Sequence, residues 1–253
     1  MKVLITFALE TEFAPWRKLR HFQRVASDVW DYRFIANVGP ADVRVVLTGA
    51  GRFAAQRAIP PAFADRPDVC ISSGLSGGLS PLHRPGDILV ARTIGEIKGT
   101  RLIRSDAELV QRAEASGAKL VEKFLVSDHV ISTTEEKHSL AGSGDAVDME
   151  SIFVLEAAAQ QRIRSVAIRA ISDGSESSLP LDFDRVFNEQ GTVSIPKVIG
   201  QVVRQPHRIG GLIRLAQESE RAAAMLAKFL DSYVQLFAAG PLPENAKPAV
   251  LAV

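Results

Sequence analysis

The segment 147-VDMESIFVLEAAAQQRIRSVAIRAISDG-174 combines an apolar helix with a buried strand, and a carboxylate stands at each end of this unit. We predict a helix over Ser151–Gln161 and a strand over Ser165–Ala170. The strand is a nearly continuous apolar run, which is typical of a strand covered on both faces of a sheet. Glu150 directly precedes the helix, and Asp173 follows the strand. This segment therefore predicts an α/β fold with polar groups at the ends of its strands.

The same alternation of strands and helices runs along the rest of the chain. The other predicted strands are Lys2–Phe7, Arg33–Asn37, Val43–Thr48, Val69–Ser73, Asp87–Arg92 and Phe124–Asp128. The other predicted helices are Glu12–Arg20, Arg52–Phe63, Asp106–Ser116, Glu135–Ala141 and a long one near Ile209–Phe237. We expect one α/β domain with a largely parallel or mixed sheet, because no repeat or clear linker divides the 253 residues.

Composition and charge exclude several classes of function. The 30 Lys and Arg residues balance 29 Asp and Glu residues, so the chain has no excess positive charge with which to bind nucleic acid. The single cysteine, Cys70, excludes an intramolecular disulfide, and no Cys/His cluster has the spacing of a zinc site. We expect no metal.

The chain opens on a strand-like run rather than a signal peptide, and no apolar stretch is long enough to span a membrane, which favours a cytoplasmic protein.

Two glycine motifs match known patterns in the wrong context. Gly49-Ala50-Gly51-Arg52-Phe53-Ala54 fits the dinucleotide-binding pattern, but it follows a later strand and Pro60-Pro61 interrupt the next helix. Gly74-Leu75-Ser76-Gly77-Gly78 fits the nucleophile elbow of hydrolases, but another strand follows it instead of a helix. Both motifs instead predict small-residue loops at the carboxyl ends of strands, where open α/β sheets bind ligands.

Carboxylates recur beside these loops. Glu10 and Glu12 follow the first strand, Asp148 and Glu150 precede the quoted helix, and Asp173 ends the quoted strand. Each alone is explained by favourable charge at a helix N-terminus or by an Asp-Gly turn. Their convergence on one edge of one sheet is the pattern of an active site.

Four motifs, in order, resemble the purine nucleoside phosphorylase/uridine phosphorylase superfamily, near the methylthioadenosine/S-adenosylhomocysteine nucleosidases. They are Met1–Glu12, Thr48-Gly49-Ala50-Gly51, the run Ser73–Leu79 with Pro85-Gly86-Asp87, and the pair VDMES and VAIRAISD. The resemblance extends to about residue 235 and implies a three-layer α/β/α sandwich around a mixed, partly barrel-like sheet. It also implies a homo-oligomer. We expect a catalytic domain over residues 1–238 and a flexible, proline-containing tail over 239–253.

By position, the resemblance implies roles for the carboxylates. Glu150 corresponds to the glutamate that binds the ribose hydroxyls, and Met149 to the methionine that packs under the sugar. Asp173 corresponds to the acid that protonates N7 of the purine, and Glu12 to the glutamate that activates water. These residue types suit the chemistry, because cleavage of an N-glycosidic bond builds positive charge on the ribose and negative charge on the base.

The resemblance implies further substrate contacts at Leu75, Ser76, Gly77 and Ser172. Leu75 departs from the family, because the nucleosidases usually carry a serine at its position. The segment Ser127–Thr134 is similar to the part that packs on the purine, without the usual aromatic residue.

Val130 and Ile131 are expected to supply an apolar floor for the purine in place of that aromatic residue. Water or phosphate is expected near Gly49, Gly51 and Arg52, so phosphate is an alternative co-substrate, and no other cofactor is implied.

The stretches SDHVISTTEEKHSL, AVDMES and RAISD are similar to the hopanoid-associated phosphorylases, which remove adenine from adenosylhopane. This similarity implies an adenine nucleoside with a lipid-like 5′ substituent as the substrate. The basic and apolar stretch Lys197–Arg214 would suit contact with anionic lipid on the inner face of the membrane, or it forms a solvated positive face. Alternatives are a methylthioadenosine/S-adenosylhomocysteine nucleosidase, a nicotinamide-dependent enzyme and a nucleoside-binding protein without catalysis.

Overall fold

The computed structural model describes residues 1–25, 32–183 and 206–240, together with 186, 188, 191–194, 197, 198, 200 and 201. The strands are β1 (Lys2–Phe7), β2 (Gln23–Val25), β3 (Tyr32–Val38), β4 (Ala41–Leu47), β5 (Val69–Gly78), β6 (Ile88–Glu96), β7 (Leu102–Arg104), β8 (Lys119–Val126), β9 (Ala146–Asp148) and β10 (Arg164–Asp173). The helices are α1 (Glu10–Arg20), α2 (Arg52–Ala62), α3 (Ala107–Ala115), α4 (Thr134–Leu140), α5 (Ser151–Gln160), the short 3-10 helix η2 (Pro206–Arg208) and α7 (Ile209–Ala238).

One mixed sheet contains the ten described strands. Its centre is parallel, because β1 pairs with β4 and β5, and β5 pairs with β10. Five strands close into a ring: β5 pairs with β10, β10 with β6, β6 with β8, β8 with β9, and β9 with β5. The strands β1, β4, β3 and β2 extend from β5 as an open wing. The predicted mixed, partly barrel-like sheet is confirmed.

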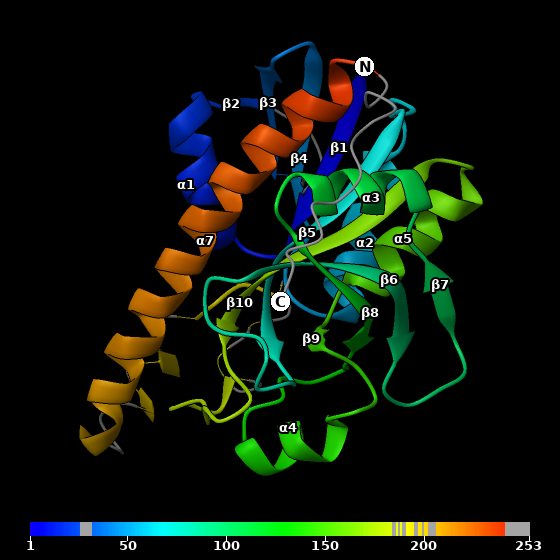
Figure 1. Ribbon diagram of the computed structural model, residues 1–253. Helices are drawn as coiled ribbons and strands as arrows, with labels where there is room; N and C mark the ends of the chain where they lie inside the picture. Colours follow the sequence, from blue (N-terminus) through cyan, green and yellow to red (C-terminus); the bar gives the residue numbers. More distant parts are fainter. Residues whose placement is uncertain are drawn as a thin grey trace, which may run out of the picture.

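Two hydrophobic cores cover the two faces of this sheet. Residues along a strand point alternately to opposite faces, so Val3 and Ile5 of β1 belong to the first core and Leu4 to the second. Helices α1, α3 and α7 complete the first core, and α2 and α5 complete the second (Figure 1). The predicted three-layer sandwich is therefore confirmed.

The long helix α7 holds two other helices against the sheet. Its Asp231 accepts hydrogen bonds from the indole Nε1 of Trp16 at 3.1 Å and from the guanidinium of Arg20 at 2.5 and 2.6 Å. Two residues further along α7, the buried Tyr233 donates its hydroxyl to the carbonyl of Leu109 in α3 at 2.9 Å. Polar contacts thus fix α1 and α3 beside α7.

The predicted elements differ from the structure mainly at their ends. The sequence does not predict β2, β7 and β9, because a strand of three residues is too short to show a periodic pattern. It also misses the first half of β8, where Lys119-Leu120-Val121-Glu122-Lys123 shows neither a strict alternation nor a continuous apolar run. The prediction of a loop over Gly74–Gly78 is wrong, because β5 continues through these residues to Gly78.

Two sequence predictions fall wholly or partly outside the described residues. The tail predicted over 239–253 is described only at Ala239 and Gly240, and the basic stretch lacks description at residues 199 and 202–205. The domain boundary at 238 stays a prediction. Among the helices that the structure describes, none combines the length and apolar character needed to cross a membrane.

Replacing Asp231 by alanine should lower the free energy of unfolding by about 2 kcal/mol, because Trp16 and Arg20 lose a charged acceptor. Urea denaturation followed by circular dichroism measures this change. Glu220→Ala, at an exposed position on the same helix, is the control and should change the free energy by less than about 0.5 kcal/mol. Equal effects of the two substitutions would contradict the role given to Asp231.

Candidate active site

A cavity of about 210 Å³ lies at the carboxyl ends of β1, β5 and β10. Parallel pairing brings these ends to one edge of the sheet, and the register aligns Asp173 with Gly77. Every residue predicted for catalysis or substrate binding lines this cavity. The lining consists of Ala8, Leu9, Glu12, Ala50, Leu75, Ser76, Gly77, His129, Val130, Ile131, Val147, Asp148, Met149, Glu150, Ser172, Asp173, Leu179, Phe183, Leu215 and Ser219.

Glu150 directly precedes α5 and reaches the glycine turn that follows β4. The backbone N–H of Gly51 donates to Oε1 of Glu150 at 2.6 Å. Gly51 has a φ of 86°, which residues with side chains rarely adopt. The position of a β-carbon at Gly51 lies 3.6 Å from Cε of Met149, which is an ordinary van der Waals distance, so Met149 packs against the turn. Glycine therefore lets the turn bring its amide to the carboxylate while Met149 packs beside it.

A buried arginine lies next to Glu150 in the structure. Arg169 of β10 is only 1% exposed, and its Nε lies 3.1 Å from Oδ2 of Asp148. Its Nη2 donates to the hydroxyls of Ser72 at 3.0 Å and Ser151 at 2.8 Å. Oδ1 of Asp148 accepts from the backbone N–H groups of Glu150 and Ser151, both at 2.9 Å. The Asp148–Arg169 pair therefore fixes the first turn of α5 and, with it, Glu150.

The surroundings of Glu150 disfavour its ionised form. Burial raises the pKa of Glu150 to about 8, and the negative charges of Asp148 and Glu12 act in the same direction. The amide of Gly51 and the charge of Arg169 act in the opposite direction but do not offset burial. Hydroxyl groups of a sugar that donate to this carboxylate would favour its ionised form.

Glu12 of α1 is held by three backbone N–H groups. Ala8 and Leu9 donate to its Oε2, and Leu75 of β5 donates to its Oε1, each at 2.9 Å. Burial raises the pKa of Glu12, while these backbone hydrogen bonds oppose the rise. At Gly74, whose φ is 146°, a β-carbon would lie 3.0 Å from Oε1. Glycine at this position therefore lets the carboxylate lie against β5.

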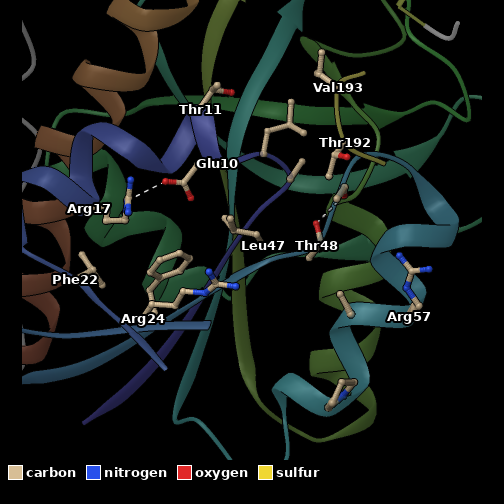
Figure 2. A pocket seen from close by; sticks show the side chains of 16 residues that line it. Glu10, Thr11, Arg17, Phe22, Arg24, Leu47, Thr48, Arg57, Thr192 and Val193 are labelled. Atoms are coloured by element: carbon tan, nitrogen blue, oxygen red, sulfur yellow. Dashed lines mark hydrogen bonds and ion pairs between the residues drawn. The ribbon is translucent and has the colours of Figure 1, made fainter. Parts of the chain in front are cut away.

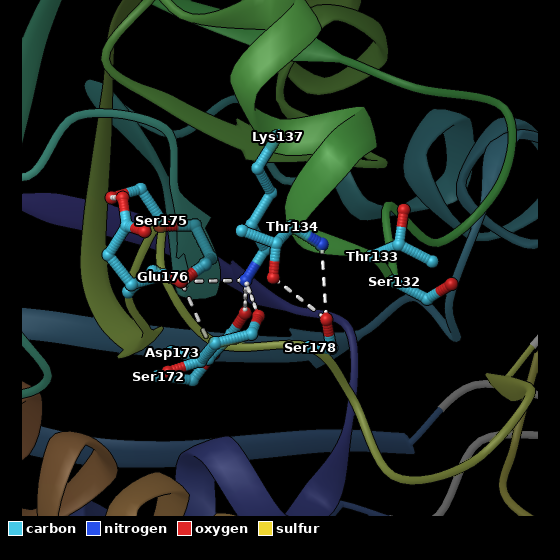
Figure 3. Close-up of polar contacts among 12 residues, drawn as sticks. Ser132, Thr133, Thr134, Lys137, Ser172, Asp173, Ser175, Glu176 and Ser178 are labelled. Carbon is cyan, nitrogen blue, oxygen red and sulfur yellow. Dashed lines mark hydrogen bonds and ion pairs between the residues drawn. The ribbon is translucent and has the colours of Figure 1, made fainter.

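Asp173 pairs with a lysine that the sequence analysis does not predict. Lys137 of α4 is fully buried, and its Nζ lies 2.5 Å from Oδ2 of Asp173. The same Nζ donates to the carbonyls of Gly174 at 2.8 Å and Ser177 at 2.7 Å, and Ser172 donates its hydroxyl to Oδ1 of Asp173 at 2.5 Å (Figure 3). The carboxyl of Asp173 is therefore held by two partners, the ammonium of Lys137 and the hydroxyl of Ser172.

The sequence around Lys137 hides its burial. The helix reads Thr134-Glu135-Glu136-Lys137-His138, a mixture of charges that is typical of a solvated face. A capping box between Thr133 and Glu136 does mark where α4 begins. No local pattern, however, indicates that the third helical residue after Thr134 points into the protein.

The remaining lining supplies apolar surface and one unsatisfied hydroxyl. Val130 and Ile131, predicted as the purine floor, line the cavity together with Val147, and His129 joins them without having been predicted. Ser76 is buried, and its hydroxyl has no hydrogen-bond partner among the described residues. Buried hydroxyls are rarely left unpaired, so Oγ of Ser76 is suited to a ligand.

The structure does not bring the three predicted anion-binding residues together. Gly51 contacts Glu150, whereas Gly49 lines a second, larger cavity. The guanidinium of Arg52 lies 3.0 Å from Glu96 and 3.3 Å from Asp128, and Arg52 lines neither cavity. An anion at Arg52 would have to compete with two carboxylates, which hold the side chain away from the site.

The raised pKa of Glu150 predicts that stability depends on pH. The folded protein retains a proton on Glu150 up to about pH 8, whereas the ordinary pKa of a glutamate is 4.5. The free energy of unfolding of the wild type, relative to Glu150→Gln, should therefore fall as pH rises from 4.5 to about 8. Urea denaturation over this range measures the difference.

Glu135→Gln, at an exposed position in α4, is the control for the substitution of a glutamate by glutamine. A difference between the wild type and Glu150→Gln that does not change with pH would contradict the effect of burial on the pKa of Glu150.

Comparisons with solved structures show related folds at low sequence identity. A futalosine hydrolase mutant of Helicobacter pylori strain 26695 has a TM-score of 0.72 at 16% identity, covering 93% of this chain and 99% of that one. The 5′-methylthioadenosine/S-adenosyl homocysteine nucleosidase of Helicobacter pylori has a TM-score of 0.71 at 16% identity, with 93% and 98% covered. The S-adenosylhomocysteine nucleosidase of Streptococcus pyogenes has a TM-score of 0.72 at 15% identity, with 93% and 97% covered.

The solved structures show only the fold at this level of identity, whereas a match to a family model shows the family of the chain. The model described as the phosphorylase superfamily matches residues 5–204, which is most of the chain. The match confirms the superfamily resemblance found in the sequence motifs and the predicted class of phosphorylase-like enzyme. The chain belongs to the phosphorylase superfamily.

Proposed function

We propose that the protein cleaves the N-glycosidic bond of an adenine nucleoside that carries a 5′ substituent, and that it releases adenine. The observation that supports this proposal most strongly is the arrangement of Glu12, Glu150 and Asp173 around one cavity of about 210 Å³. Each carboxylate has different partners, so each can take a different part in one reaction. The presence of all three argues against a nucleoside-binding protein without catalysis.

In the proposed reaction, the bond between C1′ of the ribose and N9 of adenine breaks, and its electron pair leaves with the base. Glu150 accepts hydrogen bonds from the ribose hydroxyls and stabilises the positive charge that develops on the sugar. Asp173 delivers a proton to N7 of the departing base. Lys137 is a positioning residue, because it holds Asp173 and the carbonyls of Gly174 and Ser177 at once.

We propose water as the nucleophile. Glu12 accepts three backbone hydrogen bonds and lies in the same cavity as the hydroxyl of Ser76, which has no partner among the described residues, so the two can orient a water molecule. As the oxygen of this water forms its bond to C1′, Glu12 accepts the proton that the water loses. Neither Lys nor Arg occurs among the described residues that line this cavity. A phosphate ion would meet carboxylates there without a cationic side chain, which makes phosphorolysis the less favoured alternative.

For the 5′ substituent, our first candidate is the polycyclic hydrocarbon of adenosylhopane, by the resemblance of the motifs around Glu150 and Asp173. A methylthioadenosine/S-adenosylhomocysteine nucleosidase is the second candidate. It is favoured by the solved structures of similar fold, one of which holds 5′-methylthioadenosine in its active site. The two candidates differ in the size of the apolar group on C5′, which can be varied in a series of substrates.

We also propose peripheral contact with anionic lipid through the start of α7, and assembly into a homo-oligomer. His207, Arg208 and Arg214 are exposed there beside the exposed apolar side chains of Ile209 and Ile213. Basic and apolar residues exposed together suit the interface of a negatively charged membrane.

Asp173→Asn should lower kcat for adenine release about 10²–10⁴-fold, because asparagine cannot donate a carboxyl proton to the base. Glu150→Gln should lower it about 10²-fold, because the neutral amide stabilises the sugar cation poorly. Adenine release from 5′-methylthioadenosine and from a 5′-dodecylthio analogue measures both. The exposed Glu135→Gln in α4 is the matched control and should retain the wild-type rate. Full activity of Asp173→Asn would refute the proposed acid.

Adenine release by the wild type should not depend on added phosphate, and the sugar product should carry a free anomeric hydroxyl. Chromatography of the products with and without phosphate distinguishes this sugar from a ribose 1-phosphate. A rate that requires phosphate, together with a phosphorylated sugar, would show that the nucleophile is phosphate and that Glu12 has another role.

Substituting both Arg208 and Arg214 with glutamate should release the protein from vesicles of anionic phospholipid, because the membrane would then repel the start of α7. Co-sedimentation with such vesicles measures the bound fraction. The control reverses the sign of the charge change, because it replaces Glu218 and Glu220, further along α7, by lysine. Failure of the wild type to bind any anionic vesicle would contradict the membrane contact.

A further inference from the structure

Arg52 is the first residue of α2, and its side chain connects this helix to three other parts of the protein. Its Nη2 donates to Oε1 of Glu96, at the end of β6, at 3.0 Å. Its Nε lies 3.3 Å from Oδ1 of Asp128, in the segment that follows β8. Its Cζ lies 5.3 Å from the centroid of the ring of Phe153 in α5. One side chain therefore ties β6, the segment after β8 and α5 to the beginning of α2.

On one side, Arg52 adjoins the carboxylate that is proposed to bind the sugar. Gly51 directly precedes Arg52, and its backbone N–H donates to Oε1 of Glu150 at 2.6 Å. Phe153, which packs against the guanidinium, donates its own backbone N–H to the carbonyl of Glu150 at 3.0 Å. Arg52 is thus connected to both segments that place Glu150, the glycine turn and the first turn of α5.

On the other side, Arg52 reaches the segment that is proposed to hold the base. His129, Val130 and Ile131 directly follow Asp128 in the chain, and all three line the small cavity. The ion pair between Arg52 and Asp128 connects α2 to this segment. The bond that breaks joins the sugar to the base, so the two halves of the site have to keep a fixed separation.

The side chain of Arg52 does not face a ligand itself. It lines neither the small cavity nor the larger one of about 740 Å³, to which α2 contributes Arg57, Ala58 and Pro61 (Figure 2). The side chain is 35% exposed, and two carboxylates hold its guanidinium. Any effect of Arg52 on the reaction therefore acts through the residues that it holds.

A second arginine in the same cluster provides an internal comparison. The Cζ of Arg101 lies 5.4 Å from the centroid of the ring of Phe153, and its Nε donates to Oε2 of Glu96 at 2.8 Å. Its remaining ion pair joins it to Glu156 at 2.9 Å. The two arginines thus share one ring and one carboxylate. Among the described residues, only Arg52 also adjoins the glycine turn and pairs with the segment of the base.

We infer that Arg52 is a positioning residue, which holds the carboxylate of Glu150 and the segment after Asp128 at the separation that the nucleoside requires. This inference rests on the proposed function and names the residue that aligns the sugar half of the site with the base half. A guanidinium suits this task, because its planar fork can bond two carboxylates and stack on a ring at once, whereas the ammonium of a lysine cannot.

The first test measures the carboxyl of Glu150 and needs no turnover. Burial raises the pKa of Glu150 to about 8. The charged groups that act on it are Asp148 of β9, Glu12 of α1 and Arg169 of β10, and substitution of Arg52 alters none of them.

The hydrogen bond from Gly51 lowers the pKa of Glu150. Arg52→Met should loosen the glycine turn and weaken this bond, so the pKa of Glu150 should rise above its wild-type value. NMR titration of isotopically labelled glutamate carboxyls measures the shift, and Glu150→Gln identifies the signal.

The second measurement is kcat for adenine release from 5′-methylthioadenosine. Arg52→Met should lower kcat about 10- to 100-fold, because a small displacement of the sugar relative to the base misaligns the reacting groups. Arg101→Met is the matched control, since it removes an equal charge from the same ring and the same carboxylate. It should leave the pKa of Glu150 unchanged and should change kcat by less than about threefold.

Thermal denaturation verifies that both variants are folded. Arg52→Lys replaces Arg52→Met if the latter is unstable, and it should shift the pKa of Glu150 and kcat in the same directions by smaller amounts. Wild-type values for Arg52→Lys would show that a charge alone suffices and would overturn the inference. Equal effects of Arg52→Met and Arg101→Met on the pKa of Glu150 and on kcat would overturn it as well.

The failure of the proposed function would look different. The wild type would then release adenine from no nucleoside, although the pKa of Glu150 still responded to Arg52→Met and not to Arg101→Met. That result would retain Arg52 as the residue that places Glu150 and would remove the reaction. Adenine release by the wild type, with no difference between the two variants, would do the reverse.

Discussion

The buried guanidinium of Arg169 is the constraint on which the site depends. A buried charge is tolerated only when it is paired and hydrogen-bonded, and Arg169 finds its partners in three other elements. Asp148 ends β9, Ser72 belongs to β5 and Ser151 begins α5. These contacts join the barrel to the helix that follows it. Glu150 stands between Asp148 and Ser151, so the same contacts determine where its carboxylate lies.

Negative charge gathers around Arg169 in the site. Burial raises the pKa of Glu150, and the nearby negative charges of Asp148 and Glu12 raise it further. Backbone amides of Gly51 and Leu75 offset part of the repulsion. An arrangement that disfavours the ionised form of Glu150 becomes favourable when sugar hydroxyls donate to it. Under the proposed function, the protein gives up stability at neutral pH and places Glu150 where it can bind a sugar that develops positive charge.

The sequence predicts those parts of the structure that local patterns determine. The apolar run of β10 and the helix α5 are evident from periodicity, and the motifs place Glu12, Glu150 and Asp173 beside one another. Long-range pairing is not evident, which is why the three-residue strand β9, which closes the barrel, is missed. The surroundings of Lys137 and Arg52 also depend on long-range contacts that the local sequence does not show. Lys137 looks solvated and is buried against Asp173, whereas Arg52 looks free to bind an anion and is held by Glu96 and Asp128.

The central claim is that one nucleoside occupies the cavity of the three carboxylates, with its base at Asp173 and its ribose at Glu150. A crystal structure with an unreactive adenosine analogue tests this claim most directly. The account predicts N7 of the base within hydrogen-bond distance of Asp173 and the ribose hydroxyls on Glu150. A base bound away from Asp173, or a ribose bound away from Glu150, would contradict it.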